Sequence, residues 1–235
     1  MHDTSALKDG EEIVDSVERK IYRRTKKSLG HEFLELAAEN GFTQVPMYYG
    51  EEKGVQIVEL CALGTVKFMW CEDLNAKTLS EIVEALSAIH ALSEKKLGEG
   101  CVYALSDFDA AMSSFWRRGD GLLVLDGWTN GGSEIKSPEN ALVDFSLAVL
   151  YRAVKQPFGN ESGAKELITA LDSYSYGINI LDSFGDKLLS EIERRIAEID
   201  RKSNKHRYMM LANVRGVIEA YIDEFNSISP VKNNE

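Results

Sequence analysis

The hydrophobic pattern changes early in the chain, and this change limits the folds open to it. In residues 45–49 and 55–61, short apolar runs are bounded by turn-forming residues such as Gly50 and Gly54, which is typical of strands. From Thr78 onward, apolar residues recur at helical spacing over most of the remaining sequence. A small strand-rich part followed by a larger helical part predicts an α+β fold.

The same patterns predict the individual elements. Strands are expected in a hairpin over 12–28, at 45–49, at 55–61 and in the apolar run that ends at Asp126. Helices are expected over 30–41, 78–92, 142–155, 163–174, 186–200 and 207–226. We therefore expect a small N-terminal β/α lobe at residues 1–65, a helical lobe with a loop and hairpin at 66–229, and a flexible tail at 230–235.

Composition argues against several classes of protein. The net charge of −11 disfavours a general nucleic-acid binder, since phosphate contacts need clustered Lys and Arg; segment 19–27, with six basic residues in nine, is a local exception. No apolar run approaches ~20 residues, and no basic region followed by an apolar one opens the sequence. We expect no membrane span, no signal peptide and a cytoplasmic location. Three cysteines without metal-ligand spacing predict reduced thiols.

Three acidic residues stand at positions that suggest a structural or chemical role for the carboxylate. Asp107 lies in a loop-like stretch, Asp126 ends the apolar run 122–125, and Asp144 opens the segment Asp-Phe-Ser-Leu-Ala. An acid at the end of a buried strand is costly to place unless it holds a metal, accepts a proton or fixes a loop. These positions are therefore candidates for chemistry.

Four short motifs follow one another in the order found in a known family. They are Lys20-Ile-Tyr-Arg-Arg24, His31-Glu-Phe33, Gln44-Val-Pro-Met-Tyr48 and Ala88-Ile-His-Ala-Leu92. In this order they resemble the aminoglycoside and choline kinase branch of the protein-kinase-like phosphotransferases. Segments 105–112, 124–126 and 144–148 stand where that family has its catalytic loop, its metal-binding Asp and its Asp-Leu-Ala motif. The resemblance implies a two-lobe protein-kinase-like fold with a small β-rich N-lobe and a mainly helical C-lobe.

The resemblance also implies a reaction. The family transfers a phosphoryl group from ATP, with Mg²⁺, to a hydroxyl of a small molecule, and the protein's part is mainly to position groups and neutralise charge. Asp107 corresponds to the base that orients the acceptor, and Asp126 corresponds to the metal ligand. Arg23, or alternatively Lys20, corresponds to the cation that faces the phosphates, and Glu32 corresponds to the acid that holds this cation.

The sequence departs from the family where catalysis is most demanding. Leu105 and Ser106 replace the His and Gly of the catalytic loop, and Met112 replaces the metal-binding Asn. A thioether is a poor ligand for the hard Mg²⁺ ion, and no glycine-rich loop precedes the basic strand. An alternative is therefore a pseudokinase that binds a nucleotide or a partner protein without catalysis.

A second alignment within the same superfamily assigns the acids differently. In it Asp126 is the catalytic acid, Asn130 is the metal ligand and Asp144 belongs to an Asp-Phe-Gly-like motif. This alignment resembles the small atypical protein kinases that partner the tRNA threonylcarbamoylation enzyme. The step from Asp126 to Asn130 is shorter than that family uses, so we prefer the first alignment, in which Asp144 is a structural anchor of the catalytic loop.

The same sequence features also have purely structural interpretations. Asp107 and Asp126 can act as helix or loop caps, and His90 is expected to be a core histidine. An acidic α+β interaction protein unrelated to kinases is the remaining class. In an enzyme, the helices at 157–226 would form the acceptor pocket, where a cationic acceptor suits the acidic charge. The candidates for lining that pocket are Asp172, Tyr174, Tyr176 and Asp182.

Overall fold

The computed structural model describes residues 7–8, 11–24, 28–60, 66–67, 75–105, 115–118, 120–128, 133–155, 159–177, 179–200 and 202–228. Contacts within the chain divide it into two compact units. The first comprises Met1–Phe68, Tyr103–Ser106 and Ser113–Ile135. The second comprises Met69–Val102, Asp107–Met112 and Lys136–Glu235. Both units are thus assembled from segments that are far apart in the sequence.

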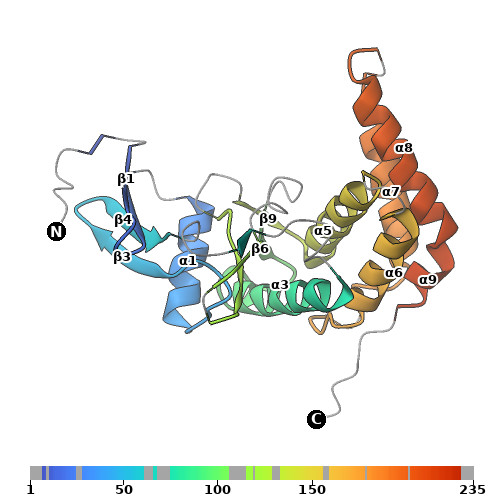
Figure 1. The fold of residues 1–235 in the computed structure, drawn as a ribbon. Helices are drawn as coiled ribbons and strands as arrows, with labels where there is room; N and C mark the ends of the chain where they lie inside the picture. The colour runs from blue at the N-terminus through green and yellow to red at the C-terminus, as the bar shows by residue number, and fades with distance from the viewer. Residues whose placement is uncertain are drawn as a thin grey trace, which may run out of the picture. The chain divides into compact units, whose positions relative to one another are not determined.

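The first unit contains a four-stranded antiparallel sheet with the strand order β1-β2-β4-β3 (Figure 1). Its strands are β1 (Glu12–Asp15), β2 (Lys20–Arg23), β3 (Tyr48–Glu52) and β4 (Val55–Glu59). The predicted hairpin and strand pair are confirmed, with one shift. The strand expected from residue 45 begins at Tyr48, since Pro46 has no N–H to donate to a neighbouring strand.

Helix α1 (Leu29–Glu39) packs against β3 in the same unit. At its C-terminal end, Phe42 N donates to Ala37 O at 2.8 Å, and Gly41 takes a φ of +66°. This is the Schellman arrangement, in which a glycine in the left-handed region closes the helix. The predicted helix stop at Gly41 is confirmed.

The remaining described strands form two smaller sheets. One has the order β5-β7-β8, with β5 (Val66–Lys67), β7 (Phe115–Arg117) and β8 (Leu123–Leu125). In the other, β6 (Val102–Leu105) pairs with β9 (Ser133–Lys136). All three residues of β8 are buried, which accounts for the apolar run before Asp126.

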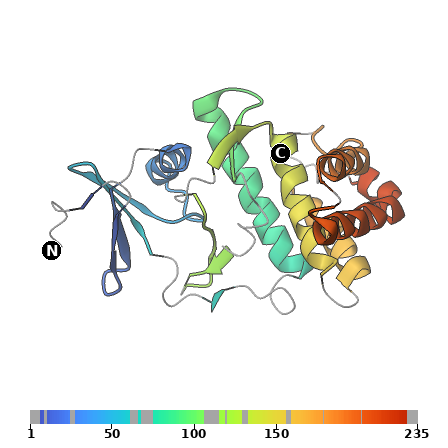
Figure 2. The ribbon, with the colours of Figure 1, turned by 90° about the horizontal axis from the view of Figure 1, so that it is seen from above.

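The second unit is mainly helical, as Figure 2 shows for the helices coloured from green to red. Its helices are α3 (Ala76–Leu97), α5 (Pro138–Ala153), α6 (Gly159–Leu171), α7 (Phe184–Ala197), α8 (Lys205–Ala220) and α9 (Ile222–Asn226). Helix α5 packs on α6 and α7, and α3 packs on α6. The helix expected from residue 78 begins at Ala76, because Asn75 Oδ1 accepts a hydrogen bond from Thr78 N at 3.0 Å and caps it.

These elements confirm the predicted fold class, which is α+β with a small β-rich N-terminal lobe and a mainly helical C-terminal lobe. The order of the elements is the one expected for a protein-kinase-like two-lobe fold. Within the described ranges, no helix is both long and apolar enough to cross a bilayer.

Candidate functional site

Asp126 directly follows strand β8 and begins a tight turn. Its Oδ1 accepts a hydrogen bond from Gly127 N at 2.6 Å, and the carboxylate is partly buried. Gly127 takes a φ of +108°, a conformation that glycine adopts without a steric penalty. The expectation that Asp126 ends a buried strand is confirmed, and the turn gives its carboxylate a defined position.

Trp128 packs this turn onto helix α1. The indole is buried, its Nε1 donates to Leu125 O at 3.1 Å, and its ring centroid lies 4.3 Å from that of Phe33. Ser133 Oγ donates to Trp128 O at 3.1 Å. A Cβ on Gly30 would come 1.7 Å from this same carbonyl oxygen, so the helix backbone lies directly against the turn. The Asp126 turn is therefore fixed to the start of α1.

A largely buried ion pair fixes the other end of the β7–β8 hairpin. Arg118 Nε and Nη2 donate to the two carboxylate oxygens of Glu59, at 3.0 and 2.6 Å. The side chains of Arg118 and Glu59 are only 12% and 6% exposed. Arg118 Nη1 also donates to Thr43 O at 3.1 Å, and Leu125 N donates to Gln44 O at 2.8 Å. The hairpin that carries Asp126 is thereby attached to the main sheet of the first unit.

The two candidate phosphate-facing cations lie on opposite faces of β2. Arg23 shares a face with Ile21, and together with Val58 and His31 they line a small hollow of about 10 Å³. Arg23 Nε donates to Glu12 Oε2 at 3.0 Å.

Lys20, on the other face, pairs with Glu18 at 2.9 Å and lies 5.2 Å above the centre of the Tyr49 ring. Since His31 belongs to α1, Arg23 is the cation on the helix side of the sheet. This placement favours Arg23 over Lys20.

The first turn of α1 connects Arg23 with the Asp126 turn. His31 lines the hollow beside Arg23, and Gly30 lies against Trp128 O. Glu32, which was expected to hold Arg23, makes no side-chain hydrogen bond or ion pair with any residue that the structure describes. The first turn of α1 thus contacts both the surroundings of Arg23 and Trp128, two residues after Asp126, and Glu12 is an acid bonded to Arg23.

The Asp126 carboxylate would supply an oxygen ligand for a magnesium ion. Mg²⁺ usually keeps several waters and takes one or two carboxylates together with substrate phosphates. In the part of the chain that the structure describes, no three His, Cys, Asp or Glu side chains come together to hold a metal by themselves. The partly buried carboxylate of Asp126 fits a metal that shares its other ligands with a nucleotide.

Asp107 and Met112, which the preferred alignment assigns to the catalytic loop, lie outside the described residues, as does Asn130. The strands that flank the segment containing Asp107 and Met112 are described. Strand β6 ends at Leu105, two residues before Asp107, and the β7–β8 hairpin leads from this segment to Asp126. The role of Asp107 stays a prediction.

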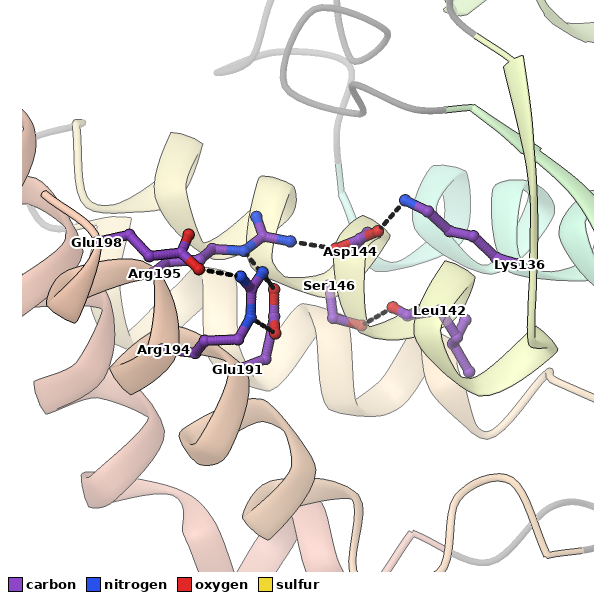
Figure 3. Close-up of polar contacts among 8 residues, drawn as sticks. All are labelled: Lys136, Leu142, Asp144, Ser146, Glu191, Arg194, Arg195 and Glu198. Atoms are coloured by element: carbon purple, nitrogen blue, oxygen red, sulfur yellow. Dashed lines mark hydrogen bonds and ion pairs between the residues drawn. The ribbon is translucent and has the colours of Figure 1, made fainter.

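Asp144 lies within helix α5, where two cations bind its carboxylate (Figure 3). Lys136 Nζ, at the end of β9, bonds to one oxygen, and Arg195 Nη2 of α7 bonds to the other. Arg195 Nε also donates to Glu191 Oε1 at 2.8 Å. Hydrogen bonds from Arg194 and then Arg195 lower the pKa of Glu191 to about 2. A chain of charges therefore ties the end of β9 and α7 to α5.

This network favours one of the two alignments. In the second alignment Asp144 would be the acid of an Asp-Phe-Gly-like motif, which lies in a loop after a strand and faces a metal. In the structure Asp144 is inside a 16-residue helix and neutralised by Lys136 and Arg195. The position fits a structural role for Asp144, and its role as an anchor of the catalytic loop stays a prediction, because residues 106–112 lie outside the described ranges.

His90 is a core residue, as expected. It is 1% exposed, and its Nδ1 lies 2.6 Å from the hydroxyl of Tyr174. Burial lowers the pKa of His90 to about 3, so the ring is neutral at physiological pH. Tyr174 is itself fully buried, so it belongs to the core and does not line an acceptor pocket.

The residues that sequence reasoning missed are Glu12, Glu59 and Arg118. Glu59 carried a signal, since it is an acid within the apolar strand 55–61, and Arg118 lies in Arg117-Arg-Gly-Asp-Gly121, a glycine-containing segment typical of a tight turn. Glu59 and Arg118 pair although they are 59 residues apart in the sequence, and no local sequence pattern predicts such a long-range contact.

No protein-family model and no curated protein matches this sequence. Among solved structures, the choline kinase LicA from Streptococcus pneumoniae is similar to this chain, with 14% sequence identity and a TM-score of 0.42. The similarity covers 90% of this chain and 93% of that one. Because both the identity and the score are low, we base the proposed function on the chain's own residues.

Proposed function

We propose that this chain is an ATP-dependent phosphotransferase of the aminoglycoside and choline kinase type, acting on a hydroxyl of a small molecule. The main support for the proposal is that a single helix turn borders both the candidate cation and the turn that carries the candidate metal ligand. The first turn of α1 borders Arg23 through His31 and the Asp126 turn through Gly30. Phosphoryl transfer needs a cation for the phosphates and a carboxylate for Mg²⁺ held in a fixed relation, and this packing supports such a pair.

In this mechanism Arg23 neutralises charge on the phosphates and Asp126 holds Mg²⁺. The metal, when bound, withdraws negative charge from the phosphate oxygens. Asp107 orients the acceptor hydroxyl and takes its proton as the new oxygen–phosphorus bond forms. The bond between the γ-phosphorus and the ADP oxygen breaks in the same transfer, so the products are the phosphorylated acceptor and ADP.

A pseudokinase is the second candidate, and Met112 favours it. In the preferred alignment Met112 stands where the family has its second metal ligand, and sulfur is a poor ligand for Mg²⁺. Such a protein would bind a nucleotide or a partner protein without turnover. The third kinase reading, a tRNA-modification-partner kinase, is disfavoured by the position of Asp144 inside α5.

Thermal unfolding with ATP and Mg²⁺, followed by an ADP-release assay, separates these candidates. A nucleotide at about 100 times its Kd stabilises the folded state by about 2.7 kcal/mol. ADP release is then measured over amino alcohols, aminoglycosides and sugars, for the wild type, Asp107→Asn and the neighbouring control Asp109→Asn.

An active wild type with an inactive Asp107→Asn variant supports the phosphotransferase. Stabilisation without ADP release on any acceptor supports the pseudokinase. Activity retained in Asp107→Asn contradicts the choice of base. No stabilisation by any nucleotide contradicts the phosphotransferase and a nucleotide-binding pseudokinase, and leaves a protein that acts by binding a partner.

A further inference from the structure

Arg23 is held by an acid on the neighbouring strand. Glu12 of β1 is its cross-strand partner in the antiparallel register. Arg23 Nε donates to Glu12 Oε2 at 3.0 Å, and Arg23 Nη2 donates to the same oxygen. The side chain of Arg23 is 21% exposed and that of Glu12 is 44% exposed, so the guanidinium is the more covered of the two.

This contact fixes the orientation of a planar group. A guanidinium carries five N–H donors in one plane, and Glu12 takes two of them along one edge. Strand pairing holds the two backbones opposite each other, so the plane cannot turn without breaking these hydrogen bonds. Arginine recognises phosphate through paired N–H groups, and a guanidinium that is already oriented needs less ordering when the phosphate arrives.

The helix acid does not provide this support. Glu32 forms no side-chain hydrogen bond or ion pair with a described residue, although α1 comes close enough for His31 to share a hollow with Arg23. Strand β2 also offers an internal comparison, because its second cation, Lys20, pairs with Glu18 on the opposite face.

We propose that Glu12 is the positioning residue that holds Arg23 for the phosphates of ATP. The inference rests on the proposed function, in which Arg23 faces those phosphates. Glu12 acts through Arg23 and does not touch the nucleotide. Removing its charge therefore weakens the binding of the phosphates and leaves the binding of the nucleoside part unchanged.

Calorimetric titration with ATP and Mg²⁺, and separately with adenosine, tests this role. The proteins are the wild type, Glu12→Gln, Arg23→Gln, the double variant and the matched control Glu18→Gln. We expect Glu12→Gln to raise the Kd for ATP about tenfold and to leave the Kd for adenosine unchanged. The double variant binds ATP no more weakly than Arg23→Gln, because Glu12 acts only through Arg23. Glu18→Gln changes neither constant.

A second substitution separates position from charge. Glu12→Asp keeps the negative charge and shortens the side chain by one CH₂ group, so it is also expected to weaken ATP binding. Glu12 lies on an edge strand and is partly exposed, and thermal unfolding of each variant checks that the fold is retained.

Tighter ATP binding in Glu12→Gln overturns the inference, since Glu12 would then compete with the phosphates for Arg23. The inference also fails if Glu12→Gln binds ATP like the wild type while Arg23→Gln binds it weakly, a result that leaves the proposed function standing. If Arg23→Gln also binds ATP like the wild type, the role of Arg23 fails. If the wild type does not bind ATP, the proposed function itself fails.

Discussion

Replacing Gly30 by alanine tests whether α1 is locked against the Asp126 turn. A Cβ at this position would lie 1.7 Å from Trp128 O and 2.6 Å from Ser133 Oγ. The nearest atoms belong to the Trp128 backbone, which cannot rotate away, so the helix or the turn has to move. Alanine's higher helix propensity favours the variant by about 1 kcal/mol, whereas a methyl group forced into a packed site costs roughly 1–3 kcal/mol or more. We expect the clash to dominate and the free energy of unfolding to fall by about 2 kcal/mol.

Urea denaturation followed by circular dichroism measures this change, and Gly216 in helix α8 supplies the control. No atom lies within 4 Å of a Cβ at Gly216, so Gly216→Ala gains the helix propensity alone and should be about 1 kcal/mol more stable than the wild type. We also expect Gly30→Ala to weaken Mg²⁺-dependent ATP binding, because its clash displaces the turn that carries Asp126. A Gly30→Ala protein that is as stable as Gly216→Ala would refute the packing argument.

Three further substitutions or conditions have defined outcomes. Glu59→Ala leaves the Arg118 guanidinium buried without its carboxylate and should lower the free energy of unfolding by about 3–5 kcal/mol in urea denaturation; a loss below about 1 kcal/mol contradicts the role of this pair. The folded-state pKa of His90, about 3, lies below its unfolded value near 6.5, so the stabilisation is complete above pH 6.5 and is lost as the pH falls towards 3, by up to about 1.4 kcal/mol per pH unit. Urea denaturation at several pH values measures how steeply the free energy of unfolding depends on pH. This dependence should become weaker in His90→Gln, and an unchanged dependence contradicts the role assigned to His90. Asp144→Asn removes the charge between two cations and should cost about 1–3 kcal/mol in the same assay, while Glu198→Gln, in an exposed pair, should change stability by less than about 0.5 kcal/mol; equal losses contradict the anchor role.

Local sequence signals predicted those features that neighbouring residues determine. The stop of α1 at Gly41 follows from one residue that adopts a positive φ at no steric cost. The burial of β8 follows from its apolar run, and the hairpin β1–β2 and the strand pair β3–β4 follow from the spacing of such runs. Where the prediction shifted, the cause was also local, as with Pro46 and the later start of β3.

Contacts between distant segments could not be predicted in the same way. Glu12 and Glu32 are both within a dozen residues of Arg23 in the sequence, and only the antiparallel register of β1 and β2 puts Glu12 opposite Arg23. Likewise, the contact of Gly30 with Trp128 depends on how α1 meets a turn almost a hundred residues later. The sequence therefore predicted the candidate acids and cations, and tertiary packing determined which of them meet.

The Mg²⁺ dependence of ATP binding tests the central claim most directly. Titration of ATP into the wild type, Asp126→Asn and the exposed control Asp223→Asn is carried out with Mg²⁺ and again with EDTA. We expect Mg²⁺ to strengthen ATP binding to the wild type and to Asp223→Asn, and to have no effect on Asp126→Asn, because Asp126 is the carboxylate that would hold the metal. ATP binding that responds equally to Mg²⁺ in all three proteins would contradict the account.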